Sequence, residues 1–154
     1  MSENRVEKWD KRFLALAEYI AQWSKDPSTK TGAIIVDPKN RIVSVGYNGL
    51  PIGVNDSLER LENREIKYKL IVHCERNALL FAREPVAGYR LYTWPFMSCA
   101  PCAAMVIQAG IVEVIAPISA NPRWREDFNL AQTLFNEAGV KIKLLEQNDV
   151  NASL

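Results

Sequence analysis

Two short blocks of the sequence carry side chains that bind metals and move protons. The first block, IVHCERNAL, contains His73 and, two residues later, Glu75. The second block, SCAPCA, contains a Cys-x-x-Cys pair made of Cys99 and Cys102. His73 is the only histidine in 154 residues, and two of the three cysteines lie in the second block. The remaining sequence can be interpreted as the scaffold that brings the two blocks together.

One histidine and two cysteines are ligands typical of zinc, and a catalytic zinc keeps its fourth position open for water. A Cys-x-x-Cys pair lets both sulfurs reach one ion from a single helical turn. A helix N-terminus suits such a pair, because the helix dipole there favours thiolate. Glu75 is not needed as a ligand, so its carboxylate can stand beside the water and move protons, since zinc lowers the pKa of that water to about 7.

Other interpretations exist for each part of the pattern. A lone histidine is often only a packed residue, and a Cys-x-x-Cys pair can be a redox pair or half of a structural zinc site. A structural site normally has a fourth protein ligand. The remaining thiol, Cys74, directly follows His73, and neighbouring helix positions point in different directions. A redox pair needs no histidine, and the sequence after Cys102 is apolar and helix-forming. An open catalytic zinc site is therefore favoured.

The pattern His-x-Glu followed by Cys-x-x-Cys is typical of zinc-dependent nucleobase deaminases. The sequence resembles the cytidine and deoxycytidylate deaminase superfamily, and within it the deoxycytidylate (dCMP) deaminases. The resemblance spans most of residues 26–111, through DPSTKTGAIIVD, VSVGYNGLPIGVND, HCERNAL and the run from Leu91 to Ile111. There are two departures. Ser98 precedes the first metal cysteine, where proline is common, and Cys74 stands between His and Glu, where alanine is common.

The resemblance implies zinc-dependent hydrolysis of dCMP to dUMP and ammonia, which supplies dUMP for thymidylate synthesis. It implies one Zn²⁺ per subunit, held by His73, Cys99 and Cys102. The zinc-activated water would attack C4 of the cytosine, and Glu75 would carry protons to N3 and to the leaving amine. The residues implied at the substrate are Asn48 at the sugar, the backbone N–H of Cys74 at the ring carbonyl, the backbone carbonyl of Ser98 at the amine, and Thr31, Gly32 and Ala33 near the base.

Two further features have weaker support from the sequence. The segment NPRWRE contains Arg123 and Arg125 ahead of a predicted helix, where a phosphate finds backbone N–H groups and arginine partners. A pair of surface arginines would explain the same pattern. The segment GYNGLPIG contains Gly46, Gly49 and Gly53, which suit a plain turn. The resemblance instead implies a regulatory site there, with dCTP as activator and dTTP as inhibitor.

Composition narrows the class of protein. The length predicts one domain over residues 1–154. The net charge of +1 gives no argument for binding nucleic acid or an acidic membrane. Three cysteines cannot form a disulfide framework, the charged N-terminal sequence lacks a signal-peptide pattern, and no stretch approaches a membrane span. We expect a cytoplasmic protein, of a cell or of a virus-infected host.

Hydrophobic periodicity predicts alternating helices and strands. An amphipathic helix over Glu3–Ser24, with Trp9, Phe13, Leu16, Ile20 and Trp23 on one stripe, opens the chain. Ser57–Lys69 is predicted as a short helix or a partly mobile connection whose charges form a solvated face, and it has no His or Cys for a second zinc. The other predicted helices are Val72–Arg83, with Ala78, Leu79 and Phe81 inward, Cys99–Gln108 and Arg125–Ala138. The predicted strands are Ala33–Asp37, Arg41–Tyr47, Tyr89–Thr93, Ile111–Pro117 and Val140–Leu145, before a frayed tail at 146–154.

This order predicts an α/β fold, a three-layer α-β-α sandwich with a mixed five-stranded sheet, which agrees with the cytidine-deaminase-like fold that the resemblance implies. The opening hairpin gives an antiparallel pair and later crossovers favour parallel pairing. Alternative functions are deamination of tRNA adenosine, of cytidine or of guanine, or a non-catalytic zinc protein of this fold. Family resemblance implies a homo-oligomer, such as a hexamer.

Overall fold

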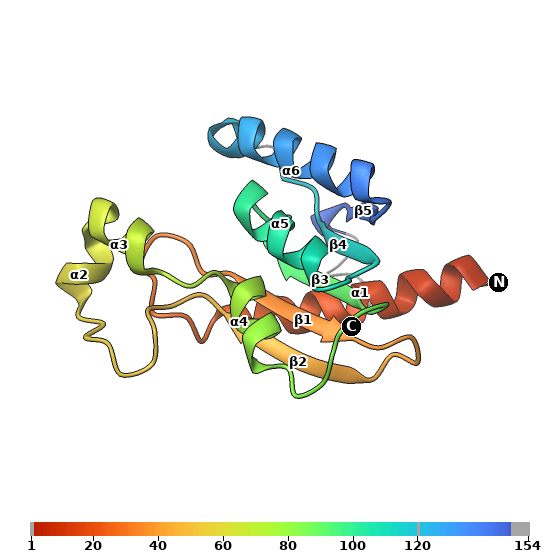
Figure 1. Cartoon of the computed structure of the whole chain (residues 1–154), viewed down its shortest axis with the longest axis horizontal. Helices are drawn as coiled ribbons and strands as arrows, with labels where there is room; N and C mark the ends of the chain where they lie inside the picture. The colour runs from red at the N-terminus through yellow and green to blue at the C-terminus, as the bar shows by residue number, and fades with distance from the viewer. Residues whose placement is uncertain (1, 120, 149–154) are drawn as a thin grey trace.

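The structure, a computed structural model, describes residues 2–119 and 121–148. Its elements alternate along the chain much as the periodicity predicts (Figure 1). In order they are α1 (Ser2–Ala21), β1 (Gly32–Val36), β2 (Ile42–Tyr47), α2 (Leu58–Glu62), α3 (Arg64–Leu70), α4 (Cys74–Phe81), β3 (Arg90–Trp94), α5 (Ala100–Gln108), β4 (Glu113–Pro117), the 3₁₀ turn η1 (Pro122–Trp124), α6 (Arg125–Ala138) and β5 (Lys141–Leu145). None of the described helices combines the length and the apolar character that a membrane span needs.

The five strands form one mixed sheet in the order β2-β1-β3-β4-β5, which confirms the predicted fold class. β1 is antiparallel to both β2 and β3, whereas β3–β4 and β4–β5 are parallel. The second antiparallel pair arises because the crossover through α4 carries the chain past β1. β2 and β3 therefore run in the same direction without being neighbours.

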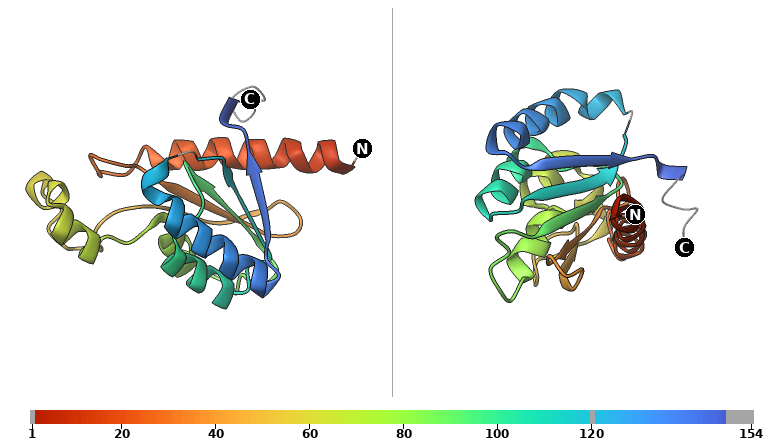
Figure 2. Two further views of the ribbon diagram at one scale, coloured as in Figure 1. Left: turned by 90° about the horizontal axis from the view of Figure 1, so that it is seen from above. Right: turned by 90° about the vertical axis from the view of Figure 1, so that its right-hand side faces the viewer.

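Helices cover both faces of the sheet, so the fold has the predicted three layers (Figure 2). Alternate residues of β1 face opposite ways, as the two-residue period of a strand requires. Ile34 and Val36 join the core beneath α1, together with Phe13 and Leu14. Ala33 and Ile35 face the other way and join the core under α4, α5 and α6, which also includes Leu91, Val106 and Phe135.

Three predictions about individual segments need correction. The stripe on α1 does not extend to Trp23, which lies past the end of the helix and is 54% exposed. Phe81 is the last residue of the eight-residue helix α4 and is 53% exposed, so it does not face inward. Residues 57–69 are largely helical, as one of the two alternatives predicted, in two short helices capped by Ser57 and Asn63, but their charges do not all lie on a solvated face, because Lys67 is buried. The predicted frayed tail lies partly outside the described residues.

Strand register brings three chain segments to one edge of the sheet. Gly32, the first residue of β1, lies opposite Tyr47 at the end of β2 and opposite Trp94 at the end of β3. The residues just before β1, just after β2 and just after β3 therefore meet. The helices α4 and α5 pack against each other on the same face, as the sequence predicted.

Gly46 lets α4 lie directly on β2. A Cβ atom on Gly46 would come within 2.4 Å of the carbonyl oxygen of Cys74 and 2.5 Å of the backbone nitrogen of Ala78. Both atoms belong to backbone, which cannot move aside as a flexible side chain can. Packing thus explains this glycine without a regulatory ligand.

The close approach predicts that Gly46→Ala destabilises the protein. The added methyl group must push α4 away from the sheet, and overpacking of this kind lowers the free energy of unfolding by about 1–3 kcal/mol. Gly49→Ala is the matched control, because a Cβ there meets no atom within 4 Å. Urea unfolding of both variants measures the difference, and equal stabilities would contradict the described contact between β2 and α4.

Candidate active site

The three predicted metal ligands lie at the N-termini of two helices. His73 is the N-cap residue of α4 and Cys99 is the N-cap residue of α5, and neither side chain caps its own helix. Cys102 lies in the first turn of α5. The positive end of a helix dipole stabilises a thiolate. The start of α5 therefore favours a thiolate, and metal binding would require both sulfurs to be deprotonated.

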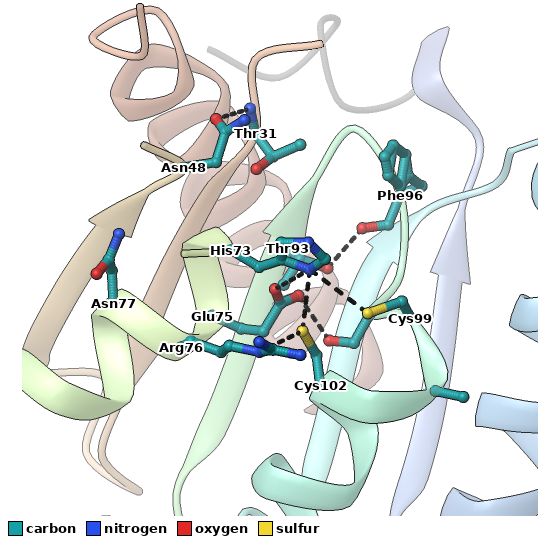
Figure 3. A network of polar contacts seen from close by, with 12 residues as sticks. Thr31, Asn48, His73, Glu75, Arg76, Asn77, Thr93, Phe96, Cys99 and Cys102 are labelled. Carbon is teal, nitrogen blue, oxygen red and sulfur yellow. Dashed lines mark hydrogen bonds and ion pairs between the residues drawn. The ribbon is translucent and has the colours of Figure 1, made fainter. Parts of the chain in front are cut away.

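The ligand atoms of His73, Cys99 and Cys102 all lie within 4.8 Å of one another (Figure 3). The Nδ1 atom of His73 is 3.1 Å from Sγ of Cys102 and 3.4 Å from Sγ of Cys99. In a tetrahedral zinc site, the usual bond lengths place a nitrogen and a sulfur ligand about 3.5 Å apart. The arrangement therefore fits one zinc ion with a fourth position left for another ligand.

The protonation of this cluster is coupled to metal binding. A hydrogen bond from Cys102 lowers the pKa of Cys99 to about 4, with help from His73. The pKa of Cys102 is raised, because its thiol donates to Cys99 and is buried, and the pKa of His73 is raised by its hydrogen bond to Cys99. Since metal binding needs thiolates and a neutral imidazole, an ion would displace the remaining protons from this cluster.

Glu75 lies beside the three ligands without being one of them. It sits in the first turn of α4 and is 5% exposed. Its Oε1 atom is 3.9 Å from Nδ1 of His73, and its Oε2 atom accepts a hydrogen bond of 2.9 Å from the hydroxyl of Ser98. The carboxylate thus lies on α4 beside His73 and faces the two cysteines of α5, as Figure 3 shows.

Two supporting residues at the cluster escaped the sequence interpretation. The Nε atom of Arg76 donates to Sγ of Cys102 over 3.2 Å, which places a positive charge on the thiolate pair. Asp127 of α6 accepts a 3.0 Å hydrogen bond from the backbone N–H of Ala100, so it caps α5 from another helix. Arg76 directly follows Glu75, which is a local cue, whereas the contact of Asp127 depends on packing.

A cavity of about 130 Å³ adjoins the cluster. His73, Cys99 and Glu75 line it, and so do aromatic side chains of the opposite wall. The ring of Phe96 lies 5.4 Å from that of Phe128 and 6.4 Å from that of Trp124, measured between centroids. Phe96 and Met97 line the cavity, whereas Trp94 packs against the core beneath α1.

Asn48 is held firmly at the edge of this cavity. Its Oδ1 atom accepts from the backbone N–H of Thr31 over 2.9 Å. Its Nδ2 atom donates to Oδ2 of Asp26 over 3.3 Å and to the carbonyl of Thr29 over 2.9 Å. Both N–H bonds of the amide are therefore used, and one lone pair of Oδ1 is left for a ligand.

A buried ion pair supports Asn48 from behind. Nζ of Lys67, on α3, lies 3.1 Å from Oδ1 of Asp26, and both side chains are almost fully buried. Asp26 also accepts hydrogen bonds from the backbone N–H groups of Ser28 and Thr29. The sequence interpretation placed Lys67 on a solvated face, which is wrong. Its long side chain instead connects the α3 segment to the cavity.

The other predicted substrate residues divide into two groups. Thr31 and Cys74 line the cavity. Gly32 and Ala33 do not, because both belong to β1: a Cβ on Gly32 would come within 2.1 Å of the carbonyl oxygen of Ala17 on α1, and Ala33 belongs to the core under α4. Ser98 is 2% exposed and reaches Glu75.

The two predicted phosphate ligands point to different places. Arg123 lines the cavity, and its Nη2 atom donates to the hydroxyl of Tyr68 over 2.9 Å. Arg125 does not line this cavity and instead lines a neighbouring pocket with Asn129 and Gln132. Arg123 belongs to the 3₁₀ turn and Arg125 begins α6, and the two side chains line different pockets.

The three predicted effector glycines also lie outside the cavity lining. Gly46 packs against α4, and Gly53 has a φ of 83°, a conformation suited to a turn. Gly49 forms a bridge with Val72, the residue before His73, through hydrogen bonds of 3.1 and 2.8 Å. This segment therefore helps to hold the start of α4.

Solved structures of known proteins share this fold. The chain superposes on a dCMP deaminase of the cyanophage S-TIM5, in complex with dCMP and dUMP, with a TM-score of 0.71 and 26% sequence identity, over 88% of this chain and 95% of that one. A tRNA:A34 deaminase gives a TM-score of 0.56 at 17% identity, covering 93% of this chain and 99% of that one, a likeness in fold alone.

Sequence relatives cover most of the chain. It is 45% identical over 143 residues to an uncharacterized deaminase, in the luxG 3′ region of Aliivibrio fischeri, with 91% of this chain and 95% of that one covered. It is 39% identical over 142 residues to the deoxycytidylate deaminase of Homo sapiens, with 88% of this chain and 79% of that one covered. Residues 7–117 match the family described as the cytidine and deoxycytidylate deaminase zinc-binding region. With the ligand cluster and Glu75 at one end of its cavity, this chain belongs to the cytidine and deoxycytidylate deaminase family.

Proposed function

We propose that this chain is a zinc-dependent hydrolase that converts dCMP to dUMP and ammonia. The observation that carries the proposal is the convergence of His73, Cys99 and Cys102 within 4.8 Å, with the buried carboxylate of Glu75 beside them at the cavity. Curated relatives named deoxycytidylate deaminase, at 39–40% identity in mouse and human, support the choice of substrate.

The three ligands would hold one Zn²⁺ per chain. When bound, zinc lowers the pKa of a water ligand to about 7 and so supplies hydroxide near neutral pH. Glu75 would accept a proton from that water and deliver it to N3 of the cytosine. It would then take the proton of the new hydroxyl group on C4 and pass it to the departing amine, so that each proton it donates is one that it has received. Its burial keeps bulk water away from these transfers, and Arg76 offsets the negative charge of the thiolates.

The walls of the cavity orient the base. Cys74 is the first residue of α4, so its backbone N–H has no acceptor within the helix and is free to bind the ring carbonyl. The acceptor for the exocyclic amine stays a prediction of the family resemblance, because Ser98, whose backbone carbonyl is implied there, does not line the cavity. Phe96 and Phe128 offer ring faces and edges on the opposite wall, where an aromatic contact with a base contributes about 1–3 kcal/mol.

Asn48 and Arg123 recognise the rest of the nucleotide. The free lone pair of Asn48 Oδ1 accepts a hydrogen bond from the 3′-hydroxyl of the sugar. Arg123 lines the cavity together with Arg64 and Tyr68, and an arginine pairs well with a phosphate monoester. Arg125 has no part in this assignment, because it lines the neighbouring pocket.

Several expectations rest on family resemblance alone and stay predictions. They are regulation by dCTP and dTTP, a homo-oligomeric state such as a hexamer, a cytoplasmic location, and a single deaminase domain over residues 1–154.

The zinc assignment predicts one zinc ion per chain. Cys102→Ala removes a ligand and should lower the zinc content to a small fraction of that value. Cys74→Ala is the matched control, because Cys74 is a buried cysteine outside the cluster and should leave the zinc content unchanged. Elemental analysis of the purified variants measures this, and equal zinc loss in both would contradict the assigned ligand set.

The proposed activity predicts ammonia release from dCMP in a panel that also contains dCTP, deoxycytidine, guanine and tRNA. Glu75→Gln keeps the shape of the side chain but cannot take up a proton. It should lower kcat on dCMP by roughly 10²–10⁴-fold while keeping the zinc. Preferred turnover of another member of the panel would refute the dCMP assignment, and zinc-loaded protein without any turnover would favour a non-catalytic zinc protein.

The placement of the two arginines predicts a difference between their variants. Arg123→Ala should raise KM for dCMP by about 10–100-fold, because hydrogen bonds to charged groups contribute about 1.5–3 kcal/mol. KM for deoxycytidine, which has no phosphate, should not change. Arg125→Ala serves as the control and should leave both KM values unchanged. Steady-state kinetics on the two substrates decides the matter, and a larger effect of Arg125→Ala would reverse the assignment.

A further inference from the structure

Ser98 makes a contact that metal binding does not require. It directly precedes Cys99, its side chain is 2% exposed, and its hydroxyl lies 2.9 Å from Oε2 of Glu75. Ser98 is not among the residues that line the cavity. Its hydroxyl therefore connects the start of α5 to the carboxylate on α4 from outside the substrate space.

This hydrogen bond distinguishes the two oxygens of the carboxylate. The terminal torsion of glutamate is broad and roughly two-fold, so an unrestrained carboxylate turns readily. An ionised carboxylate is only an acceptor, and the Ser98 hydroxyl must therefore be the donor. With Oε2 held by Ser98, Oε1 stays on the side of the ligand cluster, 3.9 Å from Nδ1 of His73.

We propose that Ser98 is a positioning residue that fixes the orientation of Glu75 for proton transfer. The hydroxyl holds Oε2, so the proton is taken up and released at Oε1. The Ser98 proton stays on its own oxygen throughout. The inference rests on the proposed deamination, and it concerns a side chain that the common proline at this position could not replace, since proline has no hydroxyl.

A purely structural role is the alternative, and the chain offers a matched control for it. Ser44 is also a buried serine, 8% exposed, whose hydroxyl donates to α4, in this case to the carbonyl of Ala78 over 2.7 Å. Both serines therefore attach α4 to a neighbouring segment. Only Ser98 reaches the carboxylate of Glu75.

The test compares Ser98→Ala, Ser98→Thr and Ser44→Ala with the wild type. Ser98→Ala should lower kcat on dCMP by about 10–100-fold, the usual effect of losing a supporting partner at such a site. KM, the affinity for the product dUMP measured by calorimetry, and a zinc content of one per chain should remain within twofold. Ser98→Thr keeps a hydroxyl and should recover most of the lost kcat. Ser44→Ala should keep the wild-type kcat.

Several outcomes would overturn the positioning role. They are a wild-type kcat in Ser98→Ala, loss of zinc or of folded protein in that variant, a failure of Ser98→Thr to exceed Ser98→Ala, or an equal loss of kcat in Ser44→Ala. A wild-type protein that does not turn over dCMP removes the proposed function as well. An active wild type with an unaffected Ser98→Ala removes the positioning role alone.

Discussion

The structure depends on two helices that begin at the same edge of one sheet and face each other. α4 contributes His73 and Glu75, and α5 contributes Cys99 and Cys102, so each helix start supplies two of the four reactive side chains. The positive ends of the helix dipoles favour the thiolates that a metal needs. Contacts with other elements hold both helix starts in place. Gly46 allows α4 to lie on β2, and Asp127 caps α5 from α6.

A second constraint shapes the opposite side of the cavity. Lys67 and Asp26 form an ion pair away from solvent, and breaking such a pair by removing one partner typically costs about 3–5 kcal/mol. The pair orders the residues before β1 and the amide of Asn48 at the same time. The metal side of the site thus rests on helix ends, whereas the nucleotide side rests on a buried polar network.

The sequence was sufficient for features with local causes. The Cys-x-x-Cys spacing places two sulfurs on one helical turn. Strand alternation divides the residues of β1, all of which are buried, between the two faces of the sheet. It was insufficient where partners are distant along the chain. The sequence around Lys67 gives no sign that this residue is buried, because its ion-pair partner Asp26 lies 41 residues away. Arg123 and Arg125 looked equivalent, because the 3₁₀ turn over Pro122–Trp124 that separates their directions is not evident from composition. The hydroxyl of Ser98 was overlooked because only its backbone matched the family pattern.

The hydrogen bonds that the amide group of Asn48 makes within the protein have a consequence for the choice between ribose and deoxyribose. Both of its N–H bonds are occupied within the protein, so it offers an incoming sugar nothing but a single acceptor. An acceptor of this kind treats the 3′-hydroxyl of a ribonucleotide and a deoxyribonucleotide alike. A preference for dCMP over CMP would therefore have to come from groups other than the amide of Asn48.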